Sequence, residues 1–179
     1  MREKKLTDNY FFDTDCISSF LWVKNECLLV KLYPGVIILP NQVYEEIKKV
    51  PHLFARIETL KSSGSLKVES IMQDSEEAKL YNQMLAGTET ILPIGRGEAA
   101  CIAMVKERGG ILASNNLRDI NVYVSQYKIR HITTGGILKE ALDKGLITMA
   151  EGETLWTNML AKKRKLGYLT FAEFLKDNS

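Results

Sequence analysis

Short apolar segments alternate along this chain with segments of helical periodicity, and this alternation limits the fold more than any other sequence feature. Four strand patterns cover residues 10–13, 36–39, 111–114 and 129–132, and a weaker one covers 66–70. Helical faces lie between them, as in Cys16, Phe20 and Val23. Strands that alternate with helices pair in parallel through right-handed crossovers. We therefore expect an α/β three-layer sandwich around a mostly parallel central sheet.

The chain after residue 132 shows no strand pattern. Helices are predicted at 133–144, 151–165 and 170–176, with Gly145 and Gly167 between them. This part has too few apolar residues to form a core of its own. We therefore expect one α/β domain at residues 1–132, and a helical C-terminal extension at 133–179 that packs on it.

Composition indicates a globular protein, with 45% hydrophobic residues, 26% charged residues and a net charge of +2 over 179 residues. With neither a membrane-spanning run nor a signal-peptide pattern, the expected location is cytoplasmic and away from membranes. Cys16 and Cys101 are predicted to be core thiols in a reducing compartment, and a zinc site is not expected. The basic run at 162–165 is interpreted as a solvated helix end rather than a phosphate-binding patch.

Acidic residues follow the predicted strands on the side where an open α/β sheet binds its ligands. Asp13 and Asp15 flank Thr14 directly after the first strand, and Asp119 lies about one helical turn beyond the fourth. A helix N-cap at Thr14 or Asp15 explains one polar residue here, but it does not explain two acids. Asp13 is therefore predicted to be a functional carboxylate.

Two further acids lie on predicted helices. Glu46 borders the buried face of the helix that follows the second strand, whereas Glu45 points toward solvent. Glu98 is turned inward at the start of the helix in GRGEAACIAMV. A boundary position accounts equally well for Glu46, and the helix dipole alone favours an acid at Glu98.

Asp13, Glu46, Glu98 and Asp119 are predicted to converge in one crevice. Crowded carboxylates raise one another's pKa unless a cation lies among them. Oxygen ligands without thiolate or imidazole favour Mg²⁺ or Mn²⁺ over zinc. Such a site suits phosphodiester hydrolysis, in which the metal activates water and stabilises the charge that grows on the phosphate.

These same segments resemble the PIN-domain nucleases. The strand–DTD–helix opening resembles the family's D-T-N, LPNQVYEEI resembles its P…V..E helix, LPIGRGEAA resembles its G.GE segment, and SNNLRD resembles its T.N..D segment. The resemblance covers roughly residues 9–132. It places the family's acids on Asp13, Glu46, Glu98 and Asp119, with Ser114 and Asn116 as supporting polar residues.

The resemblance implies a ribonuclease that depends on Mg²⁺ or Mn²⁺, with Asp13, Glu98 and Asp119 as metal ligands. Such proteins are often VapC-like toxins with an antitoxin protein as partner, and often homodimers. The tail, with GGILKEALDKGLI, is similar to a helical-tailed bacterial PIN subfamily. Asp15 stands where the family usually has asparagine, and we expect it to be a further metal ligand.

Two arginines lie within three residues of a proposed ligand. Arg96 and Arg118 are predicted to hold the RNA backbone, although surface solubility explains them equally well. Some PIN proteins also carry an aspartate where this chain has Asn115 or Asn116, and its loss would weaken a metal site.

Two other hypotheses remain. Haloacid-dehalogenase-like phosphohydrolases also open with strand–D-x-D, which would make Asp13 a nucleophile and Asp15 a general acid. Cys16 and Ile17 depart from that family's opening, and its later Asp-Asp pair is missing. The third hypothesis is a PIN-like module that binds RNA or a protein without cutting.

Overall fold

A five-stranded parallel sheet forms the centre of the computed structural model, which describes residues 8–178; residues 1–7 of the predicted domain and Ser179 lie outside the described residues. The strand order is β3-β2-β1-β4-β5, and every neighbouring pair is parallel. The strands are β1 (Tyr10–Phe12), β2 (Ile37–Pro40), β3 (Leu66–Glu69), β4 (Ile111–Ala113) and β5 (Arg130–Ile132). All five predicted strands are confirmed, with ends that differ by one residue.

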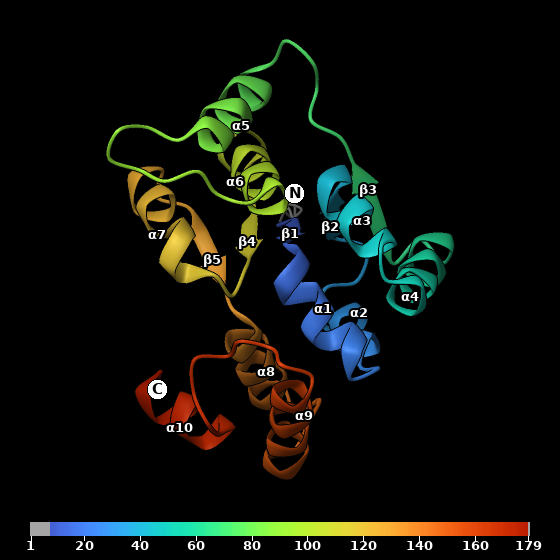
Figure 1. Ribbon diagram of the computed structural model, residues 1–179. Helices are drawn as coiled ribbons and strands as arrows, with labels where there is room; N and C mark the ends of the chain where they lie inside the picture. Colours follow the sequence, from blue (N-terminus) through green and yellow to red (C-terminus); the bar gives the residue numbers. More distant parts are fainter. Residues whose placement is uncertain (1–7, 179) are drawn as a thin grey trace, which may run out of the picture.

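Helices cover both sides of the sheet, which confirms the three-layer prediction (Figure 1). Right-handed crossovers put the helices from the first half of the chain on one side and the next three on the other. The first group is α1 (Thr14–Trp22), α2 (Glu26–Leu32), α3 (Asn41–Lys48) and α4 (Pro51–Ser62). The second group is α5 (Glu76–Ala86), α6 (Arg96–Arg108) and α7 (Leu117–Gln126).

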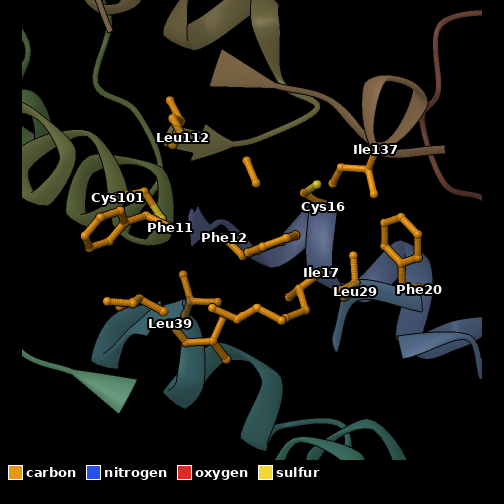
Figure 2. Close-up of a cluster of buried hydrophobic side chains, with 14 of the residues drawn as sticks. Phe11, Phe12, Cys16, Ile17, Phe20, Leu29, Leu39, Cys101, Leu112 and Ile137 are labelled. Atoms are coloured by element: carbon orange, nitrogen blue, oxygen red, sulfur yellow. The ribbon is translucent and has the colours of Figure 1, made fainter. Parts of the chain in front are cut away.

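The hydrophobic core lies on both faces of β1. Phe11 and Phe12 are both fully buried, and successive strand residues point to opposite faces, so neither face of the central strand meets solvent (Figure 2). Cys16 and Cys101 are buried free thiols, as predicted, whereas Cys27 is free and exposed. Among residues 8–178, no helix has both the length and the apolar character needed to cross a membrane.

The C-terminal part consists of α8 (Thr134–Asp143), α9 (Met149–Ala161) and α10 (Phe171–Asp177), which lie together beyond the sheet (Figure 1). The predicted helix at 151–165 was wrong at both ends. Thr148 and Glu151 form a capping box, which starts α9 at Met149. At the other end Lys163 takes a left-handed backbone with φ 59°, so the basic run follows the helix instead of ending it.

Aromatic rings join α9 to α10. The ring of Trp156 lies 5.6 Å from that of Phe171 and 5.5 Å from that of Phe174, and its indole N–H donates to the Tyr168 carbonyl at 3.2 Å. These rings belong to the same core cluster as Phe11 of β1. We retain the predicted boundary at residue 132 as a proposal, since β5 ends there.

We expect Gly152→Ala to destabilise the fold. An added Cβ would lie 2.6 Å from the Phe171 ring, so α10 must move, at a cost of about 1–3 kcal/mol. This outweighs the gain of up to about 1 kcal/mol in helix propensity. Thr157→Ala, on the exposed side of α9, is the matched control and should be neutral or slightly stabilising. Urea unfolding measures both, and equal stability of the two variants would contradict this packing.

Candidate active site

Asp13 is the buried centre of the candidate site. It directly follows β1, and its backbone N–H donates to the Ala113 carbonyl of β4 at 3.0 Å. Its Oδ1 accepts the Cys16 N–H at 2.7 Å, so Asp13 itself caps α1. The interpretation that Thr14 or Asp15 is the cap was therefore wrong. The second oxygen, Oδ2, is buried and has no hydrogen-bond partner among the described residues.

The environment of Asp13 opposes its ionisation. Burial is the largest cause and raises the pKa of Asp13 to about 7. The negative charges of Glu98 and Asp15 act in the same direction, whereas the Cys16 N–H and the Ser114 hydroxyl act against it. The Ser114 hydroxyl is near enough to lower the pKa of Asp13, but its geometry does not make a hydrogen bond to Oδ2. A cation beside Oδ2 would favour the charged form and remove this conflict.

Glu46 is held beside this carboxylate by Thr14. The Thr14 hydroxyl donates to Oε2 of Glu46 across α1 and α3. Glu46 is half-buried and Glu45 is exposed, as the helical wheel predicts. Gly97 faces the pair, since a Cβ there would lie 3.2 Å from both Glu46 Oε2 and Thr14 Oγ1. The positions of Thr14 and Gly97 beside Glu46 could not be inferred from the sequence, because both depend on contacts between distant helices.

Asn116 joins Glu98 to Asp119. Its side-chain amide donates to Glu98 Oε1 at 2.6 Å and to Asp119 Oδ2 at 2.7 Å. The other oxygen of Glu98 accepts the Gly95 N–H at 3.1 Å, so Glu98 also caps the start of α6, where the helix dipole favours an acid. The Ser114 hydroxyl accepts the Asn116 N–H at 3.3 Å. Ser114 and Asn116 therefore lie where supporting residues were predicted.

A pocket of about 280 Å³ lies among these groups. Its lining combines four of the predicted acids with small residues: Asp13, Asp15, Glu46, Glu98, Thr14, Gly95 and Gly97. Asp119 is exposed and does not line the pocket, although Asn116 links it to Glu98. Within residues 8–178, no three His, Cys, Asp or Glu side chains are grouped so that they could hold a metal ion.

Asp15 has a basic neighbour from the tail. Its Oδ1 lies 3.6 Å from the guanidinium Nη1 of Arg164, and Arg164 also lies 5.9 Å from the centre of the Trp22 ring. The sequence analysis did not connect the basic run to this site, since no local pattern relates residues so far apart.

Arg96 and Arg118, the two arginines predicted to hold the RNA backbone, line neighbouring pockets. Each of these pockets shares one residue with the site. Arg96 is exposed, donates to the Tyr81 hydroxyl at 3.4 Å, and lines a pocket of about 420 Å³ together with Glu46. Arg118 is exposed and lines a pocket of about 600 Å³ together with Asn116. Neither arginine lines the acidic pocket itself.

The donor chemistry suits a hard divalent cation, although the acids of residues 8–178 are not grouped closely enough in this structure to hold one. Every acid that lines the pocket offers carboxylate oxygens, and neither histidine nor cysteine lines it. Such ligands suit Mg²⁺ or Mn²⁺. The unpartnered Oδ2 of Asp13 is the strongest sign of a missing positive partner, because a buried carboxylate oxygen is rarely left without one.

Asp13→Asn should change how stability depends on pH. Because the folded pKa of Asp13 lies above its unfolded value, the folded state binds the proton more tightly and wild-type stability falls as pH rises toward 7. Asparagine removes this loss, so the stability of the variant relative to wild type should improve by roughly 2–3 kcal/mol between about pH 5 and pH 8. Urea unfolding in EDTA measures it. Asp74→Asn, an exposed control, should follow wild type, and parallel curves for all three proteins would contradict the raised pKa.

Comparisons with known proteins show the fold class and the family of this chain. A chain in the crystal structure of DNA-bound VapBC from Salmonella typhimurium matches with a TM-score of 0.52 and 17% identity, over 72% of this chain and 99% of that chain. At this identity the likeness shows a common fold. None of the curated proteins matches. A family model described as a PIN domain matches residues 9–178, and this protein therefore belongs to the PIN-domain family.

Proposed function

We propose that this protein is a divalent-metal-dependent ribonuclease that hydrolyses phosphodiester bonds at the acidic pocket. The observation that carries the proposal is the second oxygen of Asp13, which is buried without a partner on a pocket lined by three other acids. Membership of the PIN-domain family supports the same conclusion. The matched family also favours a nuclease over the dehalogenase-like alternative.

We assign the metal ligands to Asp13, Glu98, Asp119 and Asp15, with Mg²⁺ or Mn²⁺ as the ion. When bound, the ion would lower the pKa of water and neutralise charge that develops on the phosphate. Asn116 would hold Glu98 and Asp119 toward each other, as its two hydrogen bonds do in the structure. Asp15 must exchange its contact with Arg164 to take part.

Glu46 is a fifth acid of the proposal, and it is the one catalytic acid that we do not assign as a metal ligand. Thr14 donates to its Oε2, which orients the carboxylate, and Oε1 would accept a proton from water. Gly97 leaves the space that this pair needs. Arg96 and Arg118 would hold the substrate on either flank of the broken bond, since the acids themselves repel phosphate.

We further propose a cytoplasmic VapC-like toxin with an antitoxin protein as partner, and a homodimer as its assembly. The support is the fold shared with a chain of the DNA-bound VapBC structure. A neighbouring gene for a small DNA-binding protein, and co-purification of its product with this chain, would test the partner directly.

Mn²⁺ should stabilise the wild-type protein by binding the folded state. At a concentration about one hundred times its Kd, the gain is about 2.7 kcal/mol, which corresponds to several degrees in Tm. Asp13→Asn should lose most of this shift, because it removes the buried ligand oxygen. The control variant Asp74→Asn makes the same isosteric change outside the pocket. It should keep the full gain in stability from Mn²⁺. Equal Mn²⁺ shifts in wild type and Asp13→Asn would show that Asp13 binds no metal.

Cleavage of single-stranded RNA in Mn²⁺ tests the reaction. Asp13→Asn and Asp119→Asn should each lower kcat by at least roughly a hundredfold, since each removes a proposed ligand. Arg118→Ala should mainly raise KM and weaken the salt dependence. Single-stranded DNA of the same sequence, which lacks the 2′-hydroxyl, tests the choice of RNA.

The same assay separates the remaining hypotheses. Undiminished cutting by both aspartate variants would exclude the proposed mechanism. RNA that is bound but left intact by wild type in both Mg²⁺ and Mn²⁺ would favour a module that binds without cutting.

A further inference from the structure

The largest of the pockets described here, about 600 Å³, lies between the sheet domain and the C-terminal tail. It is formed by the loop after β4, the start of α8, and the segment that joins α9 to α10. Its lining includes Asn115, Asn116, Arg118, His131, Thr133, Lys139, Lys165, Tyr168 and Asn178. Of the residues assigned to the ribonuclease site, Asn116 and Arg118 line this pocket, and none of the acids does.

The charge of this pocket is opposite to that of the acidic pocket. Arg118, Lys139 and Lys165 line it, and no acidic residue does. Lys139 pairs with Asp143 at 2.9 Å. Arg118 and Lys165 have no ion-pair partner within residues 8–178, so their charges are available to an anionic ligand.

Asn116 connects this basic pocket to the acids. Its side chain lines the pocket, and the same amide donates to Glu98 and Asp119. A strand whose phosphate lies on the acids can therefore continue into the basic pocket. A phosphodiester chain meets both requirements, because it brings one negative charge for each nucleotide.

The neutral part of the lining suits a nucleoside. Tyr168 offers a half-buried aromatic ring, on which a base can stack, and Thr133 and Asn178 offer polar groups. The volume of about 600 Å³ lies within the range of roughly 300–1,000 Å³ that is usual for small-ligand pockets.

We propose that this basic pocket holds one nucleotide of single-stranded RNA next to the broken bond, with Arg118 and Lys165 on its phosphate; this inference rests on the proposed ribonuclease function. The tail is then part of the substrate site. Within the basic run, Lys165 belongs to the pocket, whereas Arg164 lies against Asp15. This proposal differs from the interpretation of the run as a solvated helix end, because it gives Lys165 a ligand.

RNA binding without cleavage tests the pocket. The probe is a fluorescein-labelled single-stranded RNA of about twelve nucleotides and mixed sequence, bound to the full chain in EDTA. Lys165→Glu should weaken binding at least about tenfold, whereas Lys163→Glu should weaken it less than about threefold. Lys163 is the matched control, because it is exposed in the same run and does not line the pocket. Lys165→Ala should flatten the log–log salt dependence by about 0.7, as expected for one lost contact on a single strand.

Each outcome decides the inference. Equal effects of Lys165→Glu and Lys163→Glu would mean that only the overall charge matters, and would overturn it, as would wild-type affinity in Lys165→Ala. Stronger competition by a hexaglutamate peptide than by unlabelled RNA would overturn it in favour of an acidic protein segment. A Lys165 effect on binding in a protein that never cuts RNA would support the pocket while the ribonuclease proposal fails. Normal cutting with an unchanged KM in Lys165→Ala would support the ribonuclease proposal and overturn the pocket.

Discussion

The buried carboxylate of Asp13 is the constraint on which the rest of the site depends. Its backbone is fixed between strands by the bond to Ala113, and one of its oxygens is committed to the start of α1. The other oxygen has no partner among the described residues, although burial of such a group is costly. Proteins retain the free-energy cost of such a buried, unpartnered group at positions where the group serves a function. Its position in the centre of a parallel sheet also brings the strand ends of β2 and β4 close to it.

The two asparagines after β4 bind different parts of the protein. Asn116 connects the acids Glu98 and Asp119. Asn115 binds the tail instead: its amide donates to the Thr134 hydroxyl at 2.9 Å, and its carbonyl accepts the Thr134 N–H at 2.8 Å. The loop after β4 therefore positions both the acids and the start of α8. Because Asn115 and Asn116 are adjacent, a displacement of the tail would also displace the acids.

The fold was largely predictable, because its three central strands, β2, β1 and β4, are short, apolar and largely buried. Two of the helices that were not predicted, α5 and α4, differ in the strength of their sequence patterns. α5 buries only Glu77 and Met84, and Glu77 is tolerated there because Arg108 pairs with it, so a hydrophobic pattern cannot reveal the helix. α4 does repeat Leu53, Ile57 and Leu60 on its buried face, and its signal was available in the sequence. The end of α9 was mispredicted, because lysines are good helix formers and only the backbone at Lys163 turns the chain.

For the site, the amino-acid sequence by itself determined which acids follow which strands, since strand and helix periods are local properties. It therefore predicted that Asp13, Glu46, Glu98 and Asp119 would converge in one crevice. The first three line one pocket, and Asp119 does not. Only the tertiary structure decided that Asp119 reaches them through Asn116, and that Arg164 lies against Asp15. Contacts of this kind join segments that are distant along the chain, and their geometry follows from packing of the whole core, which no local pattern encodes.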